Sequence, residues 1–104
     1  MDLSISRKRN IGTPNEETVE VYYARKFWEL LNAPFVVEYN DSKENCYVRA
    51  RIQSKEDIEQ LINIAVHNRD YWYTFDSVPQ LCELLEEFED MRKEGWSYIL
   101  EADW

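Results

Sequence analysis

The stretch from residue 46 to residue 66 changes its hydrophobic period halfway along, and this change constrains the fold most. Over 46–53 every second residue is apolar, which predicts a strand with one buried face. After Ser54 the apolar residues recur at helical spacing: Ile58, Leu61, Ile62, Ala65 and Val66. Ser54 with Asp57 three residues later is a typical helix start. A strand that leads directly into an amphipathic helix predicts an α+β fold.

Start signals and helical spacing predict two further helices, over 13–31 and 77–94. In the first, Thr13-Pro14 with Glu16 forms a capping pattern. The alternating apolar residues that follow would also fit a strand, but the capping pattern favours a helix. In the second, Ser77 precedes Val78-Pro79-Gln80, and Gly95 is placed to close the helix, with Trp96 packing back on it.

Short alternating or aromatic segments predict strands at 3–6, 35–39, 71–75 and 96–100. The resulting order, βαββαβ followed by αβ, matches a ferredoxin-like split βαβ unit over its first six elements. We therefore predict a single domain, residues 1–104, with a small antiparallel sheet covered by helices on one face.

The apolar share of 44% is enough for a core without disulfide or metal. Cys46 and Cys82 are expected to be reduced and mostly buried. No window is apolar enough to span a membrane, and the start of the chain does not resemble a signal peptide, so a cytoplasmic location is expected.

No catalytic or cofactor motif is recognisable. His67 is the single histidine and is expected to cap the end of the helix that begins at Ser54. Gly12 and Gly95 stand alone, so a glycine-rich phosphate loop is excluded. Cysteine and histidine spacings typical of metal sites are missing from the sequence. We expect no enzymatic activity, no metal and no cofactor.

The charge is placed unevenly. The net charge is −9 at pH 7, and residues 53–104 hold thirteen acidic but only four basic side chains. Carboxylates share the predicted outer face of the helix over 77–94, with one more just before it: Glu83, Glu86, Glu87, Asp90 and Asp76. Like charges three or four residues apart repel, so replacing Glu86 or Glu87 by lysine is expected to stabilise the protein. The row either attracts a basic partner or only keeps a small protein soluble.

Large aromatic side chains usually fill the core, but Trp28 and Trp72 are difficult to bury together with their neighbours. One of them is expected to be exposed, and Trp72 is a candidate interface anchor because exposed tryptophans often carry binding energy.

Tyr47, Arg49 and Arg51 lie on the polar side of the strand at 46–53. Such a face could bind single-stranded RNA or a small ligand by stacking and clamping. The segment lacks the glycine-aromatic pattern of an RNA-recognition strand. A structural alternative is pairing with Glu38 across the sheet, or cover of the sheet by the arginine stems.

The sequence therefore favours a small acidic protein-binding module, more narrowly an inhibitor that occupies a basic surface. The partner would be a nuclease, a toxin, or a restriction or CRISPR effector, which makes the protein an anti-CRISPR, anti-restriction or immunity protein. It would act as a monomer or homodimer and bind neither nucleic acid nor membrane. The alternatives are an assembly protein that self-associates through exposed aromatics, and an RNA or small-ligand binder that uses Arg49 and Arg51.

Overall fold

The computed structural model of the protein describes residues 1–41, 46–71, 74 and 76–104. Its four strands are β1 (Asp2–Arg9), β2 (Glu17–Arg25), β3 (Tyr47–Ile52) and β4 (Ser97–Asp103). They form one antiparallel sheet in the order β2-β1-β4-β3. The helices of the described chain are η1 (Trp28–Asn32, a 3-10 helix), α1 (Pro34–Glu38), α2 (Lys55–His67) and α3 (Ser77–Lys93).

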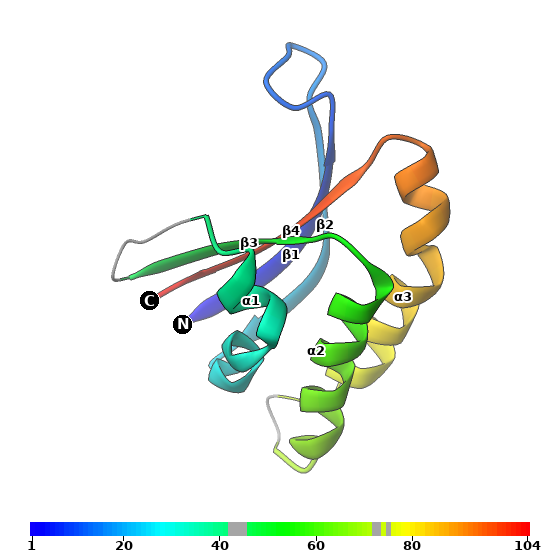
Figure 1. Ribbon diagram of the computed structural model, residues 1–104. Coiled ribbons are helices and arrows are strands. Elements are labelled where there is room, and N and C mark those ends of the chain that lie inside the picture. The colour runs from blue at the N-terminus through cyan, green and yellow to red at the C-terminus, as the bar shows by residue number, and fades with distance from the viewer. Residues whose placement is uncertain (42–45, 72–73, 75) are drawn as a thin grey trace.

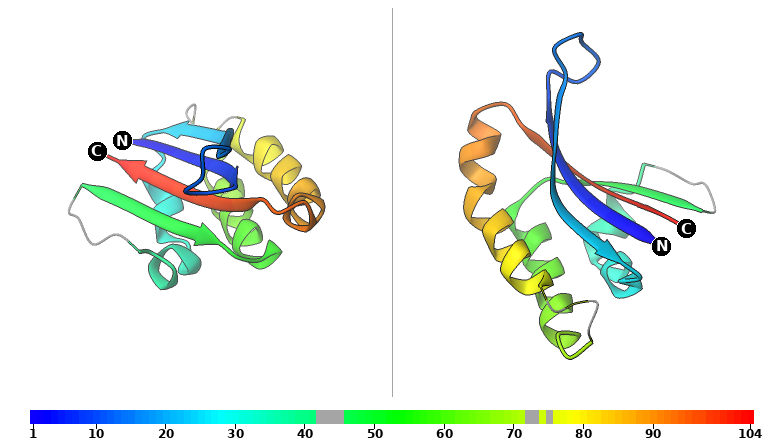
Figure 2. Two further views of the ribbon diagram at one scale, coloured as in Figure 1. Left: turned by 90° about the horizontal axis from the view of Figure 1, so that it is seen from above. Right: turned by 180° about the vertical axis from the view of Figure 1, so that it is seen from behind.

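The helices lie on one side of the sheet, and the turn end of the β1–β2 hairpin extends away from them (Figures 1 and 2). The core between sheet and helices includes Leu3, Ile5 and Leu100 from the strands, and Leu61, Leu84 and Phe88 from α2 and α3. The α+β class, with an antiparallel sheet covered by helices on one face, is confirmed. The opposite face of the sheet is called the open face below.

The predicted helix over 13–31 is wrong, because residues 17–25 form strand β2. Thr13 does use its capping groups: its hydroxyl accepts the N–H of Asn15 at 3.2 Å, and its carbonyl accepts the N–H of Glu16 at 3.1 Å. These bonds close the hairpin turn rather than start a helix. Pairing with β1 then extends the chain, with a bulge between Ile5 and Ser6.

The predicted strand over 35–39 is also wrong, because these residues belong to the short helix α1. Pro34 stands at the start of α1, and Gln60 of α2 accepts the Phe35 N–H at 3.0 Å. A side chain from a distant helix thus satisfies a free amide of the first turn. The ferredoxin-like element order is consequently wrong, since two strands precede η1 and α1.

The predicted strand over 71–75 falls largely on Trp72, Tyr73 and Phe75, which lie outside the described residues. Neither Tyr71 nor Thr74 belongs to a strand. The buried Thr74 hydroxyl donates to the carbonyl oxygens of Asn68 and Tyr71, so it braces the connection between α2 and α3.

Strands β3 and β4 and helices α2 and α3 are confirmed. The end of α3 also follows the prediction: Gly95 N–H donates to Arg92 O at 3.0 Å and Trp96 N–H to Met91 O at 3.1 Å, which is a Schellman motif. The start differs, because Asp76 is the N-cap and Ser77 lies inside the helix. The Ser77 hydroxyl instead bonds the buried Tyr22 hydroxyl at 2.7 Å.

Candidate functional site

Helix α3 positions the carboxylates that the sequence analysis selected. Its inner side is fixed in the core by Leu81, Leu84 and Phe88. With 3.6 residues per turn, this places Glu83, Glu86 and Asp90 on the solvent side, and all three are exposed. Asp76 is exposed just before the helix, two turns before Glu83, and therefore on the same side.

Glu87 does not belong to this exposed row, so its predicted place on the outer face is wrong. Its carboxylate lies 3.1 Å from Arg7 Nη1 and accepts a hydrogen bond from the Tyr98 hydroxyl at 3.1 Å. Burial raises the pKa of Tyr98 well above its ordinary value, and the Glu87 carboxylate raises it further. Glu87 therefore joins α3 to the sheet.

The remaining carboxylates are Asp76, Glu83, Glu86 and Asp90, here called the acidic row. In the described part of the chain they take part in no ion pair and no side-chain hydrogen bond. Glu89, on the flank, lies 3.7 Å from Lys55 Nζ of α2. At about 1.5 Å per residue the four charges of the row span about 21 Å, so neighbouring charges lie on average about 7 Å apart along the helix axis.

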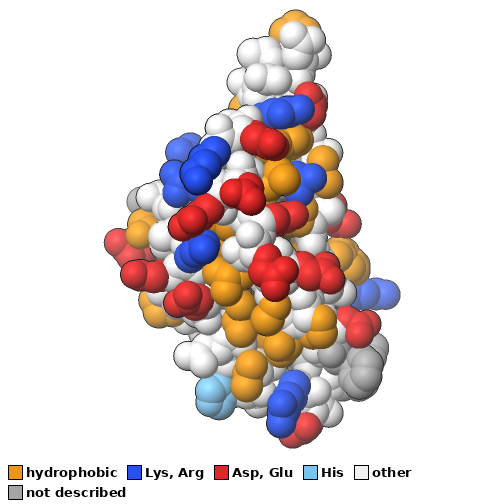
Figure 3. All heavy atoms as spheres, turned by 90° about the vertical axis from the view of Figure 1, so that its right-hand side faces the viewer, with side chains coloured by type: hydrophobic (Ala, Val, Ile, Leu, Met, Phe, Trp, Pro, Cys, Tyr) orange, Lys and Arg blue, Asp and Glu red, His pale blue; other side chains and the backbone are white. Residues whose placement is uncertain are grey.

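An apolar strip accompanies the acidic row along the outer side of the α2–α3 hairpin. Its residues are only partly buried: Ile62, Val66, Val78, Cys82 and Leu85. Val66 is 41% exposed. Figure 3, which faces the α3 side of the molecule, shows acidic side chains across the middle and hydrophobic ones gathered below them. Charge and apolar surface are therefore adjacent on this side.

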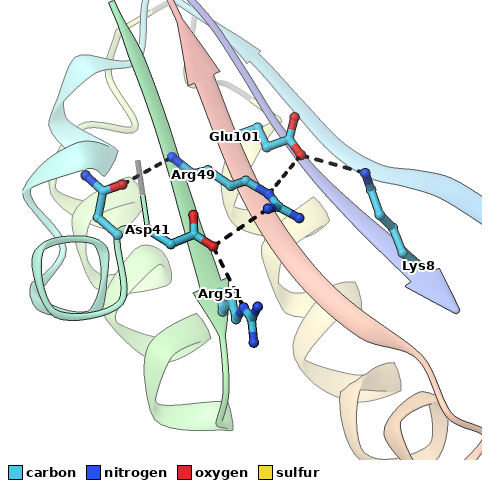
Figure 4. A network of polar contacts seen from close by, with 6 residues as sticks. Lys8, Asp41, Arg49, Arg51 and Glu101 are labelled. Carbon is cyan, nitrogen blue, oxygen red and sulfur yellow. Dashed lines mark hydrogen bonds and ion pairs between the residues drawn. The ribbon is translucent and has the colours of Figure 1, made fainter. Parts of the chain in front are cut away.

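The arginines of β3 lie on the open face, within a ladder of alternating charges (Figure 4). Arg49 lies 3.7 Å from Asp41 and 3.7 Å from Glu101, and Arg51 lies 3.9 Å from Asp41. Lys8 of β1 reaches the same Glu101 at 3.8 Å. The partners of the arginines are thus Asp41 and Glu101, not the expected Glu38.

A cavity of about 430 Å³ opens beside this ladder. Its wall combines the hairpin, β3, β4 and the end of α3, through Ile11, Arg49, Arg51, Arg92, Ser97 and Ile99 among others. Arg92 Nη1 donates to Gln53 O at 2.6 Å, which holds the end of α3 against the end of β3. Arg92 was not predicted from the sequence, because there it is only the basic residue that follows the acidic segment of α3.

Tyr47 lies at the other end of the open face, away from this cavity. It lines a smaller hollow of about 150 Å³ that also contains Asp2, Glu20, Glu101 and Asp103. Burial raises the pKa of Tyr47, and the Glu101 carboxylate raises it further. The carboxylates around Tyr47 work against stacking of a nucleic acid base there.

The aromatic candidates divide between core and surface. Trp72 lies outside the described residues. Phe27 is buried, whereas Trp28 is 47% exposed and packs edge to face with Trp104, which is 45% exposed, at 5.5 Å between ring centroids. The sequence did not select Trp104, because only the sheet brings the end of the chain next to η1.

His67 lies exposed at the end of α2, with Nδ1 2.7 Å from Asn63 O, as expected for a residue at that helix end. Across residues 1–41, 46–71, 74 and 76–104, no three histidine, cysteine or acidic side chains are grouped to hold a metal ion. No helix in the same ranges has the length and hydropathy needed to cross a membrane. Comparison with protein-family models, curated proteins and solved structures gave no match for this chain.

Proposed function

We propose that this protein is a protein-binding module that inhibits a partner by occupying its basic surface. The observation that carries the proposal is the acidic row of α3, four exposed carboxylates without ionic partners in the described chain. The row lies beside the partly buried apolar strip, in which Val66 is exposed. The expected partner is a nuclease, a restriction or CRISPR effector, or a toxin that acts on nucleic acid, because a surface that binds phosphates is basic.

The charge density of the acidic row indicates that the row and the apolar strip would have different roles in binding. A nucleic acid strand carries about one charge per 3.4 Å, which is denser than the acidic row, whose charges lie about 7 Å apart. The row is therefore better suited to steering a basic partner than to replacing each phosphate. Apolar contacts from the strip would then slow dissociation.

The test compares two variants that lose the same number of charges. The first replaces Asp76 and Asp90 by asparagine and Glu83 and Glu86 by glutamine. The control replaces four exposed carboxylates elsewhere by glutamine: Glu16, Glu20, Glu38 and Glu56. A partner is first captured from a host lysate at low salt, and its association and dissociation rates with each purified variant are then measured.

We expect the first variant to bind at least tenfold more weakly, about 1.4 kcal/mol, with most of the loss in the association rate. Wild-type binding should weaken with salt more steeply than that of the first variant. Nucleic acid should be displaced from the partner by the wild type. Equal losses of affinity in both variants would show that binding depends on the total charge and not on the acidic row, which would contradict the proposal.

The Trp28–Trp104 pair favours a second candidate, self-association of the protein. Two half-exposed indole rings in contact provide apolar area of the type enriched in interfaces. Sedimentation of the wild type and of Trp104→Ala would test it. A dimer that persists at high salt and is lost in Trp104→Ala supports this candidate, and a monomer at all concentrations excludes it.

A further inference from the structure

The cavity on the open face carries a charge opposite to that of the protein as a whole. Three arginines contribute to its wall, Arg49 and Arg51 from β3 and Arg92 from the end of α3. Of the described residues that line it, none is acidic, although the net charge of the chain is −9. We propose that this cavity binds a small phosphate monoester.

Neighbouring groups orient the arginines without occupying all of their N–H donors. The ion pairs of Arg49 and Arg51 measure 3.7–3.9 Å, longer than the 2.7–2.9 Å that is typical of a charge-assisted hydrogen bond. Arg92 is oriented by the carbonyl of Gln53. Each guanidinium has five N–H donors, so donors remain for a ligand while the side chains stay oriented.

The local charge favours an anion with several acceptor oxygens. Of the three arginines that line the cavity, Arg49 and Arg51 pair with two carboxylates that do not line it, Asp41 and Glu101. Arg92 donates to a backbone carbonyl, so the guanidinium groups exceed the carboxylates by one. A phosphate monoester carries about −1.5 to −2 at pH 7 and has three acceptor oxygens, which the planar guanidinium binds in pairs.

The cavity also has the size and apolar surface for the organic part of such a ligand. Its volume of about 430 Å³ falls within the range of about 300–1,000 Å³ that is usual for small-molecule sites. Ile99 lies on the open face yet is only 4% exposed, and Ile11 of the hairpin turn faces the same cavity. A long nucleic acid strand is disfavoured, because the charge of the protein repels a polyanion.

The proposed phosphate site contains no carboxylate of the acidic row, so a test of this site is independent of a test of the proposed function. The test is a titration of the isotope-labelled full chain, followed by amide chemical shifts. The probes are inorganic phosphate, ribose 5-phosphate and adenosine 5′-monophosphate, with adenosine as the probe that lacks the phosphate.

We expect saturable shifts at the amides of Arg51, Ser97 and Ile99 with at least one phosphate monoester, and at least tenfold weaker binding of adenosine. Arg51→Gln should weaken binding at least fivefold, and since Arg51 is exposed the variant should keep its fold, which its spectrum reports directly. The control is Arg25→Gln, which removes an exposed arginine of β2 outside the cavity and should leave binding unchanged.

Three results would overturn the proposal. One is the lack of saturable shifts in the cavity with all of the phosphate probes. Another is tighter binding of a 5′-phosphorylated oligonucleotide than of adenosine 5′-monophosphate through the same amides, which would assign the cavity to nucleic acid. The third is a change in the amide chemical shifts of the cavity residues that depends on protein concentration alone. Such a result would assign the cavity to binding of a second copy of the chain.

Discussion

Arg7 of β1 and Glu87 of α3 are 80 positions apart in the sequence and lie 3.1 Å apart in the structure, from Nη1 to Oε1. Arg7 also stacks on Trp96, with its guanidinium carbon 5.0 Å from the ring centroid. The ion pair attaches the long helix α3 to β1, an inner strand of the sheet. It also distinguishes Glu87 from its neighbour Glu86, although the helical spacing predicts both on the outer face of α3.

Lysine at position 86 or 87 should therefore have opposite effects on stability. Glu86→Lys removes repulsion within the exposed row and should raise the free energy of unfolding by about 0.3–1 kcal/mol at low salt. Glu87→Lys sets a cation against Arg7 and takes the acceptor from the Tyr98 hydroxyl, which should lower it by about 1–2 kcal/mol. Urea unfolding curves measure both, and a gain from Glu87→Lys would contradict the observed contact.

Alkaline pH should weaken the fold through Tyr22. Burial raises the pKa of this residue from 10.0 to about 12, while the hydrogen bond with Ser77 acts in the opposite direction. The unfolded chain then releases the Tyr22 proton at lower pH than the folded chain. The free energy of unfolding should therefore fall as pH rises from about 10 to about 12, by up to about 1.4 kcal/mol per pH unit for this group.

Tyr22→Phe is the variant that isolates this effect. It should cost about 1 kcal/mol at neutral pH, because the buried Ser77 hydroxyl loses its partner. Above about pH 10 its stability should decline less steeply than that of the wild type. Parallel pH profiles for the two proteins, measured by urea unfolding, would exclude Tyr22 as the cause.

Gly95→Ala should destabilise the protein through the backbone alone. Gly95 has φ +92°, and an added Cβ would meet nothing within 4 Å. The expected loss of about 1–2 kcal/mol comes from forcing an L side chain into that conformation at the end of α3. Thermal unfolding followed by circular dichroism measures it, and an unchanged transition would show that the end of α3 adapts.

Reductant and chelator should leave the unfolding temperature unchanged. Both cysteines are free, with Cys82 half-buried and Cys46 exposed rather than buried as expected. The core lies between the sheet and the helices and involves no cross-link in the described chain. A large fall in the melting temperature with either reagent would show that a covalent or metal-dependent contact supports the fold.

Local sequence pattern is enough to predict an element when that pattern agrees with the tertiary environment. The alternation over 46–53 predicts β3 because one face of that strand is buried and the other is polar. The apolar stripes of α2 and α3 and the glycine that ends α3 are equally local signals. They also place Glu83, Glu86 and Asp90 on one exposed side.

Where local signals compete, contacts between distant segments select the element that forms. Thr13 caps a single turn whether a helix or a strand follows, and pairing with β1 selects the strand. The apolar residues of α1 are also compatible with a strand, but the Gln60 side chain of α2 accepts the Phe35 N–H and so caps the first turn of a helix. The ion pair of Glu87 with Arg7 likewise depends on a contact between distant segments. The same holds for the cavity that Arg92 lines together with Arg49 and Arg51. Hydrophobic period and capping rules do not encode such contacts.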